Sequence, residues 1–118
     1  MRILGIVAVG AALMGCTASR LVAEEPSPLL RATQGVFYAW RLCAMGAARK
    51  YAPSVDSAEF IAKIATAGCT EERSLVTEGM VRLEWTAVQI LDGMKRLEAI
   101  VTESAAREVL EVRSIPKS

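Results

Sequence analysis

Apolar residues recur at helical spacing from the point where the folded part of the chain is expected to begin. Ser27 followed by Pro28 is typical of a helix start, and Pro53 cannot continue a helix, so we predict a first helix from Pro28 to about Tyr51. Its predicted inward stripe consists of apolar side chains three and four residues apart: Phe37, Trp40, Ala44, Ala47 and Tyr51.

The next segment predicts a second, short helix. Asp56 can cap its start, and Glu59, three residues later, completes the sequence pattern of a capping box. Gly68 is placed to end this helix in the left-handed conformation that glycine accepts. The predicted apolar face consists of Phe60, Ile61, Ile64 and Ala65. Thr70 then caps a third helix, which has two acidic residues in its first turn.

The third helix carries the most regular apolar pattern of the chain. Its apolar residues alternate four and three positions apart: Val76, Met80, Leu83, Ala87, Ile90, Met94, Leu97 and Val101. We therefore predict one long helix that starts at Thr70. The pattern stops at Ser104, so residues 104–113 are predicted as a separate short helix. Coiled-coil dimers also have this spacing, but Leu91 and Ile100 widen the stripe, which favours packing inside a bundle.

Two cysteines are placed to join the first two helices. In an antiparallel hairpin, Cys43 lies about 12 Å before the end of the first helix, and Cys69 lies about 18 Å beyond the start of the second, at 1.5 Å per residue. Measured along the hairpin from its connecting loop, the positions of the two cysteines differ by about 6 Å. A flexible corner after the second helix can close this difference, so we predict a Cys43–Cys69 disulfide. The alternative is a pair of reduced cysteines buried in a cytosolic core.

Together these elements predict an all-α fold. We expect a small three- to four-helix bundle, in which a disulfide-clasped helical hairpin packs on one long helix, after an N-terminal signal peptide. Gly79 and Gly93 lie beside the apolar stripe of the long helix, so the first or the second helix could approach it closely there. The alternative is that both glycines only loosen an exposed helix, at a cost of about 1 kcal/mol each relative to alanine.

The first residues have the parts of an export signal in the right order. Arg2 is followed by an apolar run from Ile3 to Met14 and then by Gly15 and Cys16. The motif Leu13-Met14-Gly15-Cys16 resembles the lipobox of bacterial lipoproteins. This resemblance implies that residues 1–15 are removed and that Cys16 carries a lipid anchor. Residues 16–26 are then the lipidated cysteine and a tether, and residues 27–118 the helical domain.

The resemblance also implies an address. A lipoprotein is attached to a membrane of the bacterial cell envelope, and a threonine rather than an aspartate after Cys16 implies the periplasmic face of the outer membrane in a Gram-negative host. An ordinary signal peptide cut after Ala18 or Ala23 is the alternative, and it would give a soluble periplasmic or secreted protein. An uncleaved anchor is disfavoured because the uncharged run between Arg2 and Arg20 has 17 residues, whereas a spanning helix needs about 20.

Composition and charge argue against several classes of function. The chain has 14 basic and 13 acidic residues, so it offers no electrostatic basis for binding nucleic acid or an anionic lipid surface. It has no histidine, which excludes histidine-based acid–base catalysis and most catalytic zinc sites. Its cysteines are too few for a four-ligand metal site, and no phosphate-binding glycine loop occurs. We therefore expect no enzyme, cofactor, metal or nucleic-acid partner.

One group of apolar residues lies away from the long stripe. Val81, Trp85 and Val88 follow at i, i+4 and i+7, so they are predicted on the opposite side of the long helix. If the other helices leave Trp85 uncovered, these three residues are candidates for binding a partner protein, because aromatic side chains dominate interface energies. The alternative is that Trp85 belongs to the core.

The expected function follows from the address and from the missing chemistry. We expect a non-enzymatic cell-envelope lipoprotein that acts as a small helical binding or structural module, held to the membrane by its lipid and with an envelope protein as possible partner. In size, leader and helix content the chain resembles the secretin-pilot lipoproteins, and it also resembles small secreted proteobacterial proteins in which two cysteines bracket a helical hairpin. The alternative is a soluble periplasmic or secreted accessory or inhibitor protein.

Overall fold

The computed structural model describes residues 27–116, and within this range the fold is all-helical. The expected signal peptide, the lipidated Cys16 and the tether lie outside the described residues. Four helices follow one another along the chain: α2 (Pro28–Tyr51), α3 (Ala58–Gly68), α4 (Thr70–Arg82) and α5 (Ala87–Ser114). The predicted all-α helical bundle is confirmed.

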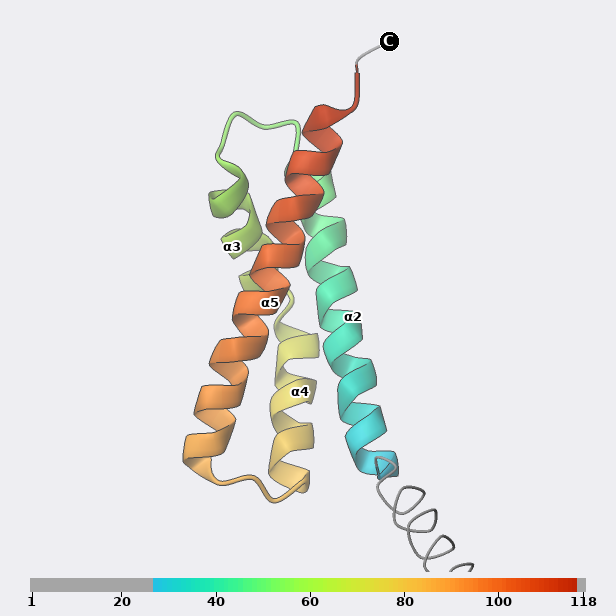
Figure 1. The fold of residues 1–118 in the computed structure, drawn as a ribbon, viewed down its shortest axis with the longest axis vertical. Helices are drawn as coiled ribbons and strands as arrows, with labels where there is room; N and C mark the ends of the chain where they lie inside the picture. The colour runs from blue at the N-terminus through green and yellow to red at the C-terminus, as the bar shows by residue number, and fades with distance from the viewer. Residues whose placement is uncertain (1–26, 117–118) are drawn as a thin grey trace, which may run out of the picture.

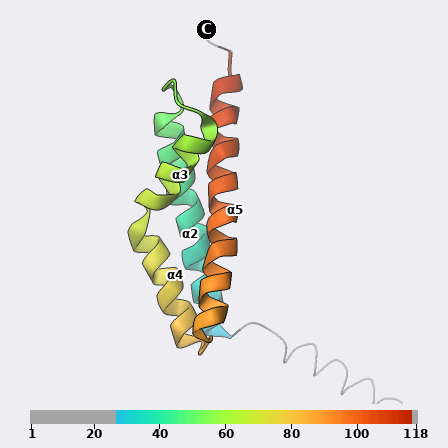
Figure 2. The ribbon, with the colours of Figure 1, turned by 90° about the vertical axis from the view of Figure 1, so that its left-hand side faces the viewer.

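The two long helices, α2 and α5, run along the whole bundle, and the two short ones follow each other along its remaining side (Figures 1 and 2). Helix α3 packs on both α2 and α5, whereas α4 packs mainly on α2. Figure 1 places the start of α2 and the α4–α5 turn at one end of the bundle, and the α2–α3 loop and the end of α5 at the other. These two ends are called the turn end and the loop end below.

Local hydrogen bonds explain where α2 and α3 begin. The Ser27 hydroxyl accepts a hydrogen bond from the Leu30 amide (3.1 Å), with proline in the first helical position, as predicted. Helix α3 is capped by Ser57, whose hydroxyl accepts from the Phe60 amide (3.1 Å), so the prediction of Asp56 as the cap is wrong by one residue. The Asp56 carboxylate accepts instead from the hydroxyl of Ser54 (3.5 Å).

The predicted ending of α3 is also wrong. Gly68 is the last helical residue, and no glycine among residues 27–116 has a positive φ. Cys69 follows at φ −89° and ψ 58° and is at the same time the residue that precedes α4. The corner between α3 and α4 is therefore a single residue, and that residue carries one of the two cysteine side chains.

The prediction of one long helix from Thr70 through Val101 is wrong. Helix α4 ends at Arg82, the chain reverses through residues 83–86, and α5 starts at Ala87. Glu84 turns the chain with φ 63°. Thr86 then caps α5: its hydroxyl accepts from the Gln89 amide (3.2 Å), and the Gln89 side chain accepts from the Thr86 amide (2.8 Å).

This reversal still buries half of the predicted apolar stripe and partly buries three more of its eight residues. Val76 and Met80 are buried on α4, and Met94 and Val101 are buried on α5. The two halves of the stripe contribute to one core from two helices instead of forming one edge of a single helix. A hairpin is therefore compatible with the same hydrophobic pattern, provided that a local signal, here the Thr86 cap, starts a new helix.

The separate helix predicted for residues 104–113 is wrong as well, because α5 continues to Ser114. Ser104 is accommodated inside the helix: its hydroxyl donates to the Ile100 carbonyl (2.9 Å) and accepts from the guanidinium of Arg41 on α2 (3.2 Å). Beyond it, Ala105 and Val109 are buried. The change in apolar phase thus reflects a change of neighbouring helix along α5, not a helix end.

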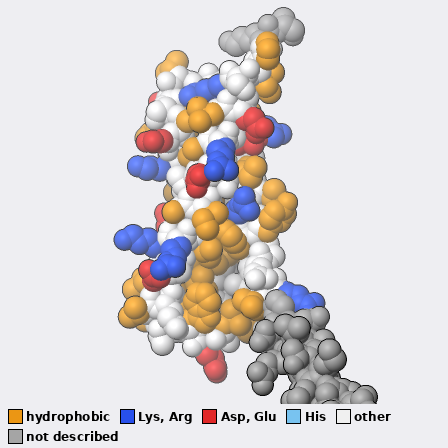
Figure 3. All heavy atoms as spheres, viewed as in Figure 1, with side chains coloured by type: hydrophobic (Ala, Val, Ile, Leu, Met, Phe, Trp, Pro, Cys, Tyr) orange, Lys and Arg blue, Asp and Glu red, His pale blue; other side chains and the backbone are white. Residues whose placement is uncertain are grey.

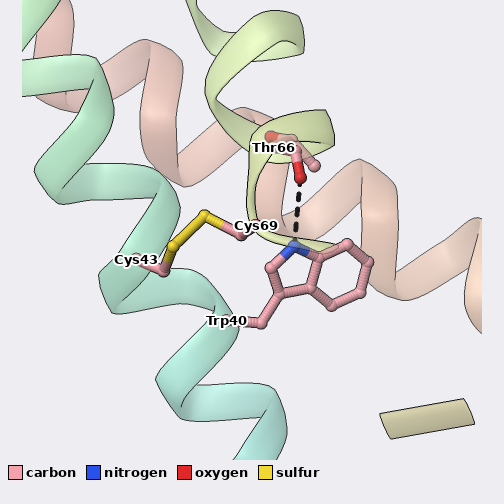
Figure 4. Close-up of a disulfide and its surroundings, with 4 residues drawn as sticks. All are labelled: Trp40, Cys43, Thr66 and Cys69. Carbon is pink, nitrogen blue, oxygen red and sulfur yellow. Dashed lines mark hydrogen bonds between the residues drawn. A yellow bond between two sulfur atoms is a disulfide. The ribbon is translucent and has the colours of Figure 1, made fainter. Parts of the chain in front are cut away.

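The centre of the bundle is joined by a disulfide and a tryptophan (Figure 4). Cys43 on α2 is bonded to Cys69 (S–S 2.09 Å, Cα–Cα 6.2 Å), which confirms the predicted clasp. One turn earlier on α2, the fully buried Trp40 donates from its indole N–H to the Thr66 carbonyl of α3 (3.3 Å). The Thr66 hydroxyl in turn accepts from Thr102 on α5 (3.2 Å), so three helices meet at this point.

Small residues fill much of the remaining core. Every fourth residue of the chain from Trp40 to Ala52 is fully buried, and the three after the tryptophan are alanines. Helix α3 contributes Ala62 and Ala65, and α5 contributes Ala105. Side chains this short allow the helix backbones to approach closely, in agreement with the dense packing of protein interiors.

Gly79 is a point of such close approach, as the sequence predicted. A Cβ atom at this position of α4 would lie 2.3 Å from the Thr33 hydroxyl oxygen of α2. The Thr33 hydroxyl donates to the Leu29 carbonyl (2.9 Å), which holds it in this position. At Gly93 the neighbour is not another helix but the ring of Trp85, which would lie 3.0 Å from an added Cβ atom.

Loss of the disulfide should destabilise the domain. We expect Cys43→Ser and Cys69→Ser each to lower the free energy of unfolding by about 3 kcal/mol, because the crosslink closes a loop of 26 residues. The double variant should lose no more than either single one, since both remove the same bond. Thermal and chemical denaturation of the three variants measures this, and additive losses would show that the cysteines are not paired.

The contact at Gly79 can be tested against a matched glycine. Gly79→Ala should cost about 1–3 kcal/mol of stability, because its methyl group overlaps Thr33. Gly46→Ala on α2 should instead stabilise by about 0.5–1 kcal/mol, because nothing lies within 4 Å of its added methyl group. Urea denaturation of both variants checks this pair, and equal effects would contradict the close approach of α2 and α4.

Candidate binding surface at the turn end

The three residues predicted to bind a partner lie together at the turn end of the bundle. Val81 is in the last turn of α4, Trp85 is in the α4–α5 turn and Val88 is in the first turn of α5. They are 59%, 39% and 76% exposed. The expectation that they share one side of a single helix is wrong, because the chain reverses between them. We call these three residues the turn surface.

Trp85 is held against the bundle on one side only. A Cβ atom at Gly93 of α5 would lie 3.0 Å from the indole Cζ3 atom and 3.4 Å from the Met80 methyl group. The ring therefore lies over the bare backbone at Gly93 and beside Met80, while the rest of it faces outward. The Trp85 amide donates to the Met80 carbonyl (3.2 Å), which fixes the backbone of the turn. Trp85 is thus neither a core residue nor a freely projecting side chain.

An apolar cavity adjoins the tryptophan. It has a volume of about 190 Å³ and is bounded by α2, α4, the turn and α5. Most of its lining is apolar, and its residues are Leu30, Thr33, Gln34, Phe37, Val76, Met80, Leu83, Trp85 and Leu97. Figure 3 shows hydrophobic side chains gathered on this half of the molecule. Through Trp85, the turn surface therefore adjoins a larger apolar region.

Two arginines near the turn surface, Arg82 and Arg96, are each paired with an acid, and Glu84 in the turn itself is exposed. Arg82 contacts Glu78 at 2.8 Å, and Arg96 contacts Asp92 at 3.1 Å, both within one helical turn. Such exposed pairs contribute little to stability, but they leave these two cations partly neutralised. The turn surface is consequently suited to an apolar or amphipathic partner and not to a strongly charged one.

A second apolar surface lies at the loop end, and sequence reasoning missed it. Tyr51, Phe60 and Ile64 are half exposed, and Val55 in the α2–α3 loop is fully exposed. The prediction that the first three face inward is wrong. Ile61 and Ala65 of the predicted α3 face are buried as expected, and Ala62 and Thr66 complete the packed face of α3. The small residues of α3 were the available signal, because they allow closer packing than the bulky ones. We call Tyr51, Val55, Phe60 and Ile64 the loop surface.

One buried carboxylate was also not predicted. Glu108 on α5 is buried and accepts hydrogen bonds from Arg49 on α2, through Nε at 2.8 Å and through Nη2. A charge-assisted contact to both guanidinium nitrogens stabilises the carboxylate where α2 and α5 meet. The pair is remote from the turn surface along the chain and has the geometry of an ion pair that joins two helices.

A group of potential metal ligands consists of Cys43, Cys69 and Glu72. Because the two sulfur atoms are bonded to each other, the group does not present thiolates.

Comparison of the chain with protein-family models, with curated proteins and with solved structures gives no match. Within residues 27–116, no helix combines the length and the apolar composition that crossing a membrane requires.

The turn surface should be dispensable for folding. We expect Val88→Ser to change the free energy of unfolding by no more than about 0.5 kcal/mol, because the side chain is mostly exposed. Val101→Ser, in the same helix but fully buried, should cost about 2–3 kcal/mol, since it leaves a cavity and an unpaired hydroxyl. Denaturant titration of the two variants compares them, and a large loss for Val88→Ser would mean that the turn surface is structural.

Proposed function

We propose that the protein is a non-enzymatic cell-envelope lipoprotein that acts as a small helical binding module, anchored through a lipid on Cys16 and making contact through the turn surface. The observation that carries this proposal is the exposure of Trp85 between two exposed valines at one end of a disulfide-joined bundle. The packing of the ring over Gly93 and beside Met80 accounts for its covered side but not for its exposed side.

The chemistry of the turn surface supports binding over catalysis. Tryptophan is the residue type most enriched at energetically important positions of interfaces, and it is most effective beside apolar neighbours that exclude water. The neighbouring Val81 and Val88 supply that surrounding surface. The disulfide joins the start of α4 to α2, and the Thr86 cap orders the start of α5, so the turn is flanked by ordered helices, which lowers the entropy lost when a partner binds.

The position of the turn surface supports the anchor. Helix α2 begins at the turn end, so a tether that leads from Cys16 to Ser27 joins the bundle at the same end as Trp85 (Figure 1). A lipid on Cys16 would keep this end close to the membrane. It would therefore raise the effective concentration of the turn surface toward any component of that membrane.

The anchor is tested through Cys16. We expect the mature protein from its native envelope to start at an acylated Cys16 and to gain the mass of two hydrogens on reduction. A Cys16→Ser chain, exported behind an ordinary cleavable signal peptide, should leave the membrane fraction, because it lacks the acyl chains that hold it. Intact mass and membrane fractionation measure the two effects.

Two controls accompany this experiment. Cys43→Ser should remain in the membrane fraction, because it removes the disulfide but not the anchor. A mature chain that starts after Ala18 or Ala23 would contradict the anchor and select the alternative function, a soluble periplasmic or secreted accessory or inhibitor protein.

A further inference from the structure

We propose that the partner of the turn surface is the lipid–water interface of the membrane that carries the anchor. This inference rests on the proposed function, because it requires the lipid on Cys16. It adds that the side chains of Val81, Trp85 and Val88 insert among the lipid headgroups and the upper parts of the acyl chains. The bundle is then oriented with its turn end toward the membrane.

The length of the tether favours this occupant. Eleven residue steps separate Cys16 from Ser27, so the start of α2 stays within about 40 Å of the anchored cysteine even if the tether is fully extended. The turn surface is at the same end of the bundle as Ser27 (Figure 1). It is therefore held within reach of the bilayer in every conformation of the tether.

The loop surface does not have this access. Helix α5 has 28 residues, which corresponds to a length of about 42 Å between the two ends of the bundle. This length slightly exceeds the full reach of the tether, which is about 40 Å. The loop surface could therefore touch the bilayer end-on only if the tether were fully stretched along the inverted bundle, which is entropically unfavourable.

The side chains of the turn surface have the chemistry of interfacial anchors. Tryptophan is enriched at membrane–water interfaces, where its apolar ring and its N–H group are both accommodated. Within residues 27–116, the indole N–H of Trp85 has no protein acceptor, in contrast to that of Trp40, which donates to Thr66. Val81 and Val88 flank the ring with exposed aliphatic groups. The turn surface can thus bury apolar atoms and keep its one N–H group hydrated.

The proposed contact between the turn surface and the lipid is apolar and not electrostatic. Arg82 and Arg96 are paired with acids, and Glu84 in the turn is exposed, so anionic lipids should give no added attraction. Contact should consequently persist at 1 M salt, where the screening length falls to about 3 Å. This separates a lipid contact of this kind from the binding of a basic surface to anionic headgroups.

Tryptophan fluorescence provides the test. The chain contains two tryptophans, and Trp40 is fully buried, so the difference between the wild type and Trp85→Phe reports on Trp85. The acylated protein is reconstituted into phosphatidylcholine vesicles whose acyl chains carry bromine just below the headgroups. We expect bromine to lower the fluorescence intensity of Trp85 by more than half and to leave the fluorescence intensity of Trp40 unchanged, at both low and high salt.

Matched variants locate the contact. Val81→Ser with Val88→Ser should reduce the quenching of Trp85 at least twofold, because they remove the flanking apolar groups. Moving the reporter to the opposite end, as Trp85→Phe with Val55→Trp, should give a tryptophan that bromine does not quench; Val55 is fully exposed and tolerates the larger ring. Circular dichroism melts establish that each variant is folded.

The outcomes separate this inference from the proposed function. An acylated protein whose Trp85 is no more quenched than Trp40 would overturn the lipid contact while leaving the lipoprotein intact. Quenching that is absent in pure lipid vesicles, together with protection of Trp85 from acrylamide in native membranes, would overturn it in favour of a protein partner. An intact mass without acyl chains would overturn both proposals, since the lipid contact depends on the anchor.

Discussion

The joint formed by the Cys43–Cys69 disulfide and the Trp40–Thr66 hydrogen bond is the contact on which the rest of the bundle depends. Helix α3 has 11 residues, which is too short to be stable alone in water. The joint fixes its last turn to the middle of α2. It also fixes the single-residue corner at which α4 begins, so the side of the bundle shared by two short helices behaves as one continuous element.

The sequence predicted the beginning of the fold better than its middle. Ser27 and Pro28 specify the start of α2 through local chemistry, and the level of the cysteines specifies the disulfide. The reversal at residues 83–86 was missed because a stripe with four-and-three spacing buries the same residues on one straight helix or on a hairpin. The Thr86–Gln89 pair is a local signal of a break, but it lies inside an uninterrupted apolar pattern that predicts a continuous helix.

For the turn surface, the sequence identified the residues but not their setting. Val81, Trp85 and Val88 were expected on the side of one helix, whereas the reversal places them at an end of the bundle. The missing side chain at Gly93 allows the Trp85 ring to lie against α5 and be partly covered, which a pattern of helix faces does not take into account. The loop surface was missed for a related reason: α3 packs through Ile61 and small residues, and hydrophobicity alone does not show that Phe60 and Ile64 are left outside this face.

The alanine-rich core gives this fold an unusual pattern of tolerance to sequence change. Where large aliphatic side chains fill a core, evolution can trim one residue and enlarge its neighbour. The buried side chains of Ala44, Ala48 and Ala52 can hardly become smaller, and a larger side chain at any of these positions would push the helices apart. Divergence is thereby directed to the outer faces of the helices, so distant relatives of this protein should share a spacing of small residues more than a recognisable sequence.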